Sequence, residues 1–420
     1  MEEDSERHSN SYLRRRHSGN GDRLRLDTAE SSPPRSRLVR ENFKYFPVQI
    51  PSSQVLMERI VERVRGVEKL KEITTKSISV PLLLNSAGLP IDQVPEDYHE
   101  PFILNGYRCH NIGAYQSLRS GFLERNNEAI NVWTHFLPSV YFLWRFCNHL
   151  GSVEYGDAYF TPWFLYSLTL VMYPMLSSLA HALNNMSVRA RHICFFVDYL
   201  GCSWYTVGAA ILYHAYSFPS EALGSVFDRY FIWIAGLNAV LSTGTASASR
   251  FLPPGKVRKT VRVLAFGLPY LYDSLPLFYR FYTGTEHPSE LAALDLFFRK
   301  FIMTSLALFF YGFHVPERIL PGRFDIIGHS HQLFHISSAV ASSYQMEGSW
   351  LDLQARRGLL QLPNHAQHVA CASLVAWSVL AINTGIVLFF AWRIMTAPAP
   401  PAVIVRKTVP SPVETKSLQN

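Results

Sequence analysis

Eight long apolar segments follow one another between residues 131 and 393 of the chain. Each is about as long as a helix needs to cross the ~30 Å hydrocarbon core of a bilayer. Charged residues are scarce within them, whereas residues 1–76 are dense in Arg, Lys, Glu and Asp. This contrast predicts an all-α membrane protein. The segments lie near 131–150, 161–183, 193–216, 230–249, 261–282, 297–315, 327–346 and 368–393.

The pattern also predicts how the chain is organised around these segments. Residues 1–76 form a Ser- and Arg-rich tail that is largely disordered, because it holds too few apolar groups to offset chain entropy. Within the tail, the apolar residues of 54–72 recur at helical spacing and indicate a short amphipathic helix. Residues 77–127 are a pre-membrane segment, 128–393 the transmembrane bundle, and 394–420 a Pro-rich disordered tail.

Composition supports a membrane protein over a soluble one. Charged residues make up 17% of the chain and hydrophobic residues 48%, while a soluble domain has about 25% charged residues. The net charge of +7 would suggest nucleic acid as a partner of a soluble protein. Here the basic residues fall between apolar segments, so membrane topology explains them and we expect no nucleic-acid partner. The five cysteines are scattered without a CxxC pair, which indicates neither a disulfide framework nor a cysteine metal site.

Basic residues predict that both termini lie in the cytoplasm. If the N-terminus is cytoplasmic, the connections after the second, fourth and sixth segments carry nine Lys and Arg residues, and the opposite connections carry six, several at helix margins. Cytoplasmic loops are enriched in Lys and Arg. The basic run Arg14–Arg16 and the residues after the eighth segment favour the same orientation.

Ionisable residues occur at the ends of three apolar segments. His181 closes the second segment, Asp198 lies near the start of the third, and His331 and His335 open the seventh. In the predicted topology all of them lie at one depth, near the cytoplasmic face. Ionisable groups in a membrane are costly and usually functional, so this coincidence predicts a polar site there.

The residue types of this cluster favour zinc. His331 and His335 are four residues apart and therefore share one helix face. With His181 they would supply three nitrogen ligands and leave one position open for water, which is the pattern of catalytic zinc sites. Asp198 could accept a hydrogen bond from that water or from a histidine N–H. The alternative is that the histidines only join helices through hydrogen bonds.

Two further sets of polar residues stand near or within the segments. Glu128, Asn131 and His135 open the first segment, and we expect them to brace the site, although Glu128 could instead cap the helix. Asp273 lies inside the fifth segment and is either a buried hydrogen-bonded group or a ligand contact. Some of the many aromatic residues in the segments could line a flat apolar pocket for a sterol or another lipid.

The N-terminal tail contains one candidate regulatory site. Ser18 follows the basic run Arg14–Arg16 and His17, a pattern that a basophilic kinase could use. Phosphate there would weaken attraction to anionic lipid. The alternative is an unmodified basic tail that serves only topology.

Four segments together resemble the progestin and adipoQ receptor family, which includes adiponectin receptors and membrane progestin receptors. The resemblance covers about residues 95–393 and is greatest to the gamma-like branch of the membrane progestin receptors. The segments are NNEAINVWTHFLPSVYFLWRF (126–146), SSLAHALNNMSVRARHICFFVDYLG (177–201), DSLPLFYR (273–280) and VPERILPGRFDIIGHSHQLFHI (315–336).

This resemblance implies a fold and a function. It implies an inverted bundle of seven transmembrane helices of the adiponectin-receptor type plus an eighth, C-terminal transmembrane helix. It implies zinc held by His181, His331 and His335, with Asp198 bonded to the water at the open position and Ser177 near the metal. The progestin branch implies a plasma-membrane steroid receptor that signals through a G protein. The adiponectin-receptor branch implies the alternative, a zinc-dependent hydrolase of ceramide-like lipids.

Overall fold

A computed structural model describes residues 88–151, 157–284, 288–357 and 365–397. All of them fall within one compact unit, Pro81–Asn420. The predicted N-terminal tail with its amphipathic helix at 54–72, the candidate phosphosite Ser18, and the C-terminal tail beyond 397 lie outside the described residues.

Helices form almost all of the regular structure in the described ranges, which contain no β-strand. Each of the eight apolar segments coincides with helix. The fifth is divided at Ser274 into two helices, next to the proline pair Pro269 and Pro276. The long helices are α4 (Ala129–Leu150), α5 (Thr161–Leu183), α6 (Val188–Leu212), α7 (Val226–Ser249), α8 (Lys256–Asp273), α9 (Leu275–Thr283), α10 (Pro288–Phe313), α11 (Ser330–Ala355) and α12 (His365–Thr396).

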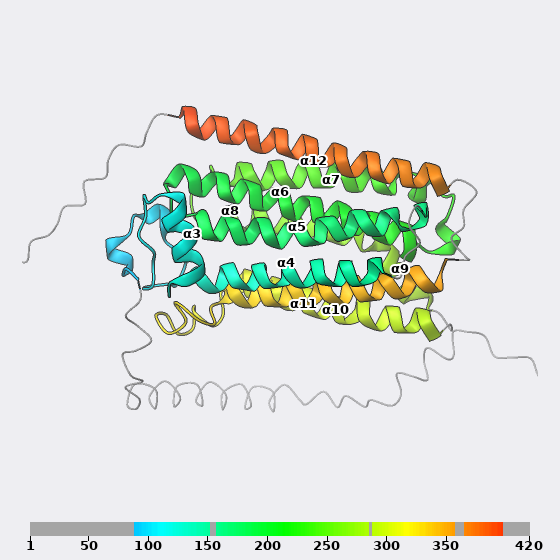
Figure 1. Ribbon diagram of the computed structural model, residues 1–420, viewed down its shortest axis with the longest axis horizontal. Coiled ribbons are helices and arrows are strands. Elements are labelled where there is room, and N and C mark those ends of the chain that lie inside the picture. Colours follow the sequence, from blue (N-terminus) through cyan, green and yellow to red (C-terminus); the bar gives the residue numbers. More distant parts are fainter. Residues whose placement is uncertain (1–87, 152–156, 285–287, 358–364, 398–420) are drawn as a thin grey trace, which may run out of the picture. The chain divides into compact units, whose positions relative to one another are not determined.

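Within the unit, α4 to α11 pack as neighbours in chain order. α4 contacts α5, α5 contacts α6, α6 contacts α7 and α7 contacts α8, while α10 pairs with α11 and α11 returns to α4. The last helix, α12, lies along the outside of α6 and α7 (Figure 1). The order of contacts therefore brings the end of α5 and the start of α11 to the same end of the bundle.

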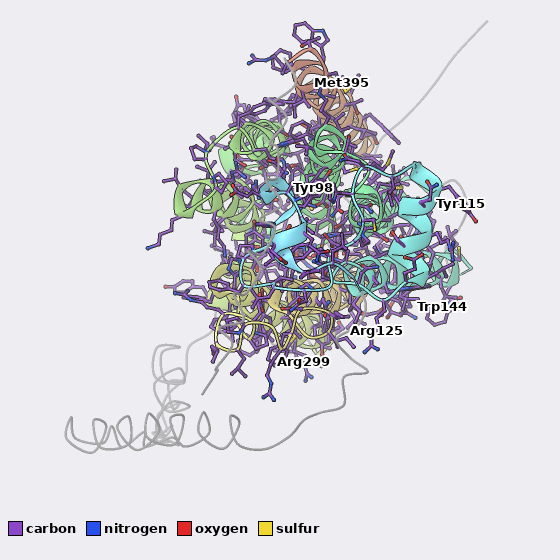
Figure 2. The ribbon with its side chains drawn as sticks, turned by 90° about the vertical axis from the view of Figure 1, so that its left-hand side faces the viewer. Tyr98, Tyr115, Arg125, Trp144, Arg299 and Met395 are labelled. Atoms are coloured by element: carbon purple, nitrogen blue, oxygen red, sulfur yellow. The ribbon has the colours of Figure 1, made fainter. Side chains whose placement is uncertain are left out.

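Four helices of the described ranges are long and apolar enough to cross a membrane, at Ala158–Leu183, Val188–Ser217, Val226–Ser249 and His368–Thr396. Large apolar side chains also point outward, including Trp144 at 55% exposure and Met395 at 56% (Figure 2). The interior combines large aromatic side chains with many buried polar ones. An outer surface this rich in exposed apolar side chains suits a lipid environment, so the fold is that of a helical membrane protein.

Close packing of α5 on α6 depends on a glycine. A Cβ atom at Gly208 would lie 2.0 Å from Oγ1 of Thr169. Small residues let two helix backbones approach closely where lipid provides no hydrophobic drive for association. The contact fixes α6 against α5, and thereby fixes Asp198 relative to His181.

A short polypeptide cap precedes the bundle. It contains two 3-10 turns, η2 (Ile91–Gln93) and η3 (Glu96–Tyr98), and the helix α3 (Ala114–Leu123). Its apolar core is formed by Val94, Tyr98, Ile103 and Tyr107. α3 packs against α4 and α5, so the cap covers the end of the bundle where α5 finishes and α4 begins.

Candidate metal centre

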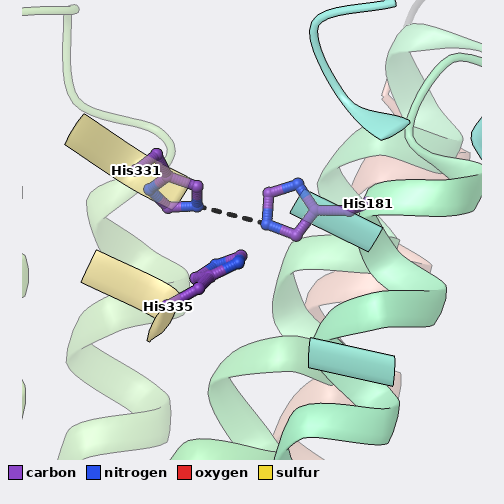
Figure 3. Close-up of side chains that lie close together, drawn as sticks. All are labelled: His181, His331 and His335. Carbon is purple, nitrogen blue, oxygen red and sulfur yellow. Dashed lines mark hydrogen bonds between the residues drawn. The ribbon is translucent and has the colours of Figure 1, made fainter. Parts of the chain in front are cut away.

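Three histidines meet where the last turn of α5 faces the first turns of α11. A ligand nitrogen of His181, of His331 and of His335 all lie within 4.8 Å of one another. The Nε2 atoms of His181 and His331 are 3.2 Å apart. Figure 3 shows the three rings converging between the two helices. His181 and His335 are buried and His331 is half-buried, so the cluster is shielded from water.

Glu128 orients the His181 ring. Its Oε2 atom lies 2.7 Å from Nδ1 of His181. A carboxylate only accepts hydrogen bonds, so Nδ1 carries a proton, and in the neutral ring Nε2 is the nitrogen left to bind a metal. Glu128 also accepts hydrogen bonds from the side-chain amides of Asn131 and Asn184. A metal-binding histidine held by a carboxylate in this way is a common arrangement.

Thr134 orients the His335 ring by the same logic. The Thr134 hydroxyl donates its hydrogen to the carbonyl oxygen of Ile130 at 2.7 Å. Its oxygen, 3.0 Å from Nδ1 of His335, must therefore accept from that nitrogen. Nε2 of His335 is left as a lone-pair donor. Two of the three rings are thus held in the tautomer that a metal ligand requires.

The donor set fits zinc. Two ligands of a tetrahedral zinc ion are about 3.3 Å apart when each bond is about 2.05 Å. The 3.2 Å separation between Nε2 of His181 and of His331 is close to this value. Three neutral imidazoles are ligands that borderline divalent metals prefer. The residues present could therefore hold Zn²⁺ and leave a fourth position open.

Asp198 and Ser177 lie beside the histidines without being part of the three-ligand group. The Asp198 carboxylate interacts electrostatically with His181 and with the hydroxyl of Ser177. The thiol of Cys202 also points at it, with Sγ 3.9 Å from Oδ1. Ser177 lies one turn before His181 on α5. The structure therefore groups the pair as neighbours of the cluster, and their chemical role stays a prediction.

The remaining residues predicted near the site have separate contacts. The His135 ring stacks on His335 with centroids 3.5 Å apart. Asn131 donates to Glu128. Glu128 does not cap α4, because its side chain makes no capping hydrogen bond. Asn126 caps the helix instead, since its Oδ1 accepts from the backbone N–H groups of Glu128 and Ala129, both at 2.9 Å.

Arg108 holds the end of α5, and no sequence motif pointed to it. Its guanidinium donates to the carbonyl oxygens of His181 at 2.6 Å and of Ala182 at 2.8 Å, and to Oδ1 of Asn184 at 2.7 Å. Burial lowers the pKa of Arg108 to about 10, so it stays charged at neutral pH. A cation at the C-terminal end of a helix is favourable, and here it fixes the turn that carries His181.

Asp273 lies away from the histidines, at the end of α8, and is buried. It interacts electrostatically with Lys300. Lys300 is one of the basic residues counted above at helix margins, but it lies well inside α10 and is 4% exposed. Its Nζ lies 4.3 Å from the ring centroid of Tyr270. A second polar cluster therefore occupies the bundle interior.

Comparison with known proteins decides the family. Residues 123–346 match the family described as Haemolysin-III related. The chain belongs to this family. It is 43% identical over 284 residues to the membrane progestin receptor gamma of Homo sapiens, covering 67% of this chain and 84% of that protein. It is 42% identical over 316 residues to the membrane progestin receptor gamma of Mus musculus. That match covers 74% of this chain and 94% of that protein.

A second subtype is also similar. The membrane progestin receptor delta of Mus musculus is 38% identical over 333 residues, with 77% of this chain and 94% of that protein covered. The predicted resemblance to the gamma-like branch of the progestin and adipoQ receptors is confirmed. The Haemolysin-III related region contains Glu128 and all three clustered histidines, whereas α12 lies beyond its end.

Proposed function

We propose that the chain is a plasma-membrane receptor for a steroid of the progestin class. The similarity to proteins named membrane progestin receptors supports this, because it extends over most of the chain. In this proposal α4, α5, α6, α7, the α8–α9 pair, α10 and α11 are seven transmembrane helices, and α12 is an eighth. Both termini are cytoplasmic, as the basic residues predict.

The interior cluster around Asp273 supplies groups that a steroid carbonyl or hydroxyl could bind. Oδ1 of Asp273 and the hydroxyl of Tyr213 are buried without a hydrogen-bond partner among the described residues. Lys300 lies 5.6 Å from the Tyr213 ring centroid and adds a donor. Aromatic rings with a few convergent polar groups suit a flat apolar ligand. The ligand would be held by its rings and oriented by its polar end.

Signalling would follow from a change in helix populations. A ligand that binds one arrangement of α8, α9 and α10 more tightly shifts the bundle toward it. The break at Ser274 makes this region a natural place for such a change. The segment 250–262 comprises the connection between α7 and α8 and the first turns of α8, and it is rich in Lys and Arg. It is cytoplasmic in the proposed orientation and is a candidate surface for a G protein.

Zinc at the three histidines would serve the receptor mainly as a structural metal that cross-links α5 and α11. When bound, it also supplies a Lewis acid that polarises a carbonyl and lowers the pKa of water. Glu128 and Thr134 hold the rings of His181 and His335 in the ligand tautomer. The helix ends are thereby fixed at the cytoplasmic side of the bundle in the proposed orientation.

One observation favours a second candidate function, a zinc-dependent amidohydrolase acting on a ceramide-like lipid. Asp198 and Ser177 lie beside the histidines, where a carboxylate could take a proton from water and a hydroxyl could bind the amide carbonyl. A purely structural metal site does not need these two groups. The two functions are compatible in one molecule, and the receptor is the one that the relatives favour.

The test uses the full chain purified in detergent. We expect saturable binding of a radiolabelled progestin by the wild type, with no measurable ceramide turnover. Asp198→Asn separates the candidates, since it should leave steroid binding intact and abolish any hydrolysis. Absence of saturable steroid binding together with Asp198-dependent ceramide turnover would replace the receptor with the hydrolase.

A further inference from the structure

A second group of metal-ligating side chains lies at the opposite end of the bundle. His214, Asp228 and His368 each place a ligand atom within 4.8 Å of the others. His214 is the second residue after the end of α6, and near the other end of α6 Phe195 lies against His181, with ring centroids 6.1 Å apart. The 25 residues of α6 span about 37 Å at ~1.5 Å per residue. This cluster is therefore separate from the three-histidine centre. We propose that it is a second zinc site.

The three ligands come from three different elements. His214 belongs to the π-helical turn η5 (Tyr213–Ser217), Asp228 to the first turn of α7, and His368 to the first turn of α12. Single π-helical turns are frequently found at functional sites. Two imidazoles and one carboxylate form a donor set that borderline divalent cations such as Zn²⁺ prefer.

The ligands are held by further contacts. The His214 ring stacks on Phe231 with an interplanar angle of 14° and on His368 with an angle of 23°. Oδ2 of Asp228 accepts the backbone N–H of Gly224 at 2.8 Å. This hydrogen bond turns the other carboxylate oxygen, Oδ1, toward His214. Supporting bonds of this kind fix ligands in zinc sites.

A simpler reading is a hydrogen-bonded pair that joins α6 to α7, since Nε2 of His214 lies 2.6 Å from Oδ1 of Asp228. That pair explains two of the three residues. The third residue, His368 of α12, also places a ligand atom within 4.8 Å of both, which completes the three-ligand geometry of a zinc site. A bound ion would widen the 2.6 Å separation to about 3.3 Å, the distance between two ligands of tetrahedral zinc.

The site would fasten α12 to the rest of the bundle. α12 contacts mainly α6 and α7. α7 supplies Asp228, and α6 continues directly into the turn η5 that supplies His214. Zinc bound at the cluster would cross-link all three helices at one end. This inference does not depend on steroid binding or on the three-histidine centre.

Zinc content of the full chain in detergent tests the site. Each variant is stripped with a chelator, equilibrated with zinc chloride and analysed for metal. We expect two zinc ions per chain in the wild type and one in the double variant His331→Ala/His335→Ala. Adding His368→Ala to that double variant should remove the remaining ion, whereas adding Glu221→Gln, an exposed carboxylate on the neighbouring turn η6 (Ser220–Ala222), should not.

Thermal melting provides the second measurement. In the double-variant background, zinc should raise the melting temperature by several degrees, and Asp228→Asn should abolish the rise while melting cooperatively without zinc. If the double variant holds no zinc, or holds equal zinc with and without His368, the second site does not exist. If instead the three-histidine centre is empty, the wild type holds one ion that His368→Ala removes and His331→Ala does not.

Discussion

Nδ1 of His181 lies 2.7 Å from Oε2 of Glu128, so a carboxylate at the start of α4 sets the orientation of an imidazole at the end of α5. Both side chains are nearly excluded from solvent, with 4% and 9% of their surface exposed. The other carboxylate oxygen, Oε1, is 2.7 Å from Nδ2 of Asn184. The pair therefore couples the packing of two helices to the geometry of the candidate metal centre.

Glu128→Gln tests this coupling. Glutamine keeps an oxygen that can accept from His181 but loses the negative charge, so the imidazole becomes a weaker donor toward a metal. Removing such a supporting group typically costs about 10- to 100-fold in metal affinity. We expect zinc affinity at the three histidines to fall by this amount, as measured by competition with a chromophoric chelator.

Glu124→Gln is the matched control. Glu124 lies at the end of α3, with 54% of its side chain exposed. Zinc affinity should not change in this variant. Equal affinities for Glu128→Gln and the wild type would show that the carboxylate does not tune the centre.

Gly208→Ala should destabilise the bundle. The added methyl group would lie 2.0 Å from Oγ1 of Thr169, so α5 and α6 must separate or Thr169 must change rotamer. Overpacking of this kind costs about 1–3 kcal/mol. We expect a melting temperature several degrees below that of the wild type in the same detergent.

Gly244→Ala provides the comparison, because a Cβ atom there meets nothing within 4 Å. Gly244 also lies inside a helix, α7, so helix propensity acts equally on both variants. Its melting temperature should match or exceed that of the wild type. Similar losses in both variants would mean that close approach of α5 and α6 is unimportant.

The helices could be predicted from hydropathy, but their ends could not. α6 begins at Val188, five residues before the apolar segment starts, because the hydroxyl of Ser187 caps it by accepting the N–H of Ala190. Arg189 and Arg191 are then helical despite their charge. A hydropathy pattern registers only apolar residues, so the polar first turn was assigned to a connection. For the same reason the sixth apolar segment starts nine residues after α10 begins at Pro288, so the pattern did not show that Lys300 lies well inside the helix and is buried.

The three clustered histidines could be chosen from the sequence because local spacing and topology both constrain them. His331 and His335 share a helix face, and alternation of helix direction brings His181 to the same end. Thr134 and Arg108 could not be identified as site residues from the sequence, since their roles depend on contacts with residues about 70 to 200 positions away in the chain. No local pattern encodes such partners. That the histidines hold zinc stays a prediction.

The interior pair Asp273 and Lys300 should contribute to steroid affinity. The two residues interact electrostatically, so removing only one of them would leave the other in the bundle interior without an opposite charge nearby, which is destabilising. The double variant Asp273→Asn/Lys300→Met avoids this. A hydrogen bond to a charged group contributes about 1.5–3 kcal/mol, so progestin affinity should fall about ten- to hundredfold in a saturation binding assay.

Asp295→Asn on the same helix as Lys300 serves as the control, since its carboxylate is 56% exposed and pairs with Arg299. Progestin affinity should be the same in Asp295→Asn as in the wild type. A folded double variant with wild-type affinity would exclude this cluster as the polar contact of the steroid.

Several basic residues counted for the predicted orientation of the termini are buried inside the bundle. Of the six on the side predicted to be extracellular, Arg280, Lys300 and Arg356 are buried inside the bundle. Arg280 is bonded to Asp352. These residues serve packing and do not report topology. On the opposite side Arg191 is buried as well, so the count of basic residues outside the buried set is eight against three. Cytoplasmic termini stay a prediction.

Inserted glycosylation sites test the orientation, on which the cytoplasmic placement of the histidines depends. The native sequon at Asn185 cannot report it, because this side chain is 3% exposed and its Nδ2 donates to the carbonyl of Cys109 at 2.7 Å. We therefore propose a new sequon on a flexible spacer, placed either between α4 and α5 near residue 156 or between α7 and α8 near Gly255. Glycan should be added at the first position and not at the second, as read from an endoglycosidase-sensitive shift in mass. The reverse pattern would place His181, His331 and His335 at the extracellular face and the second histidine cluster in the cytoplasm.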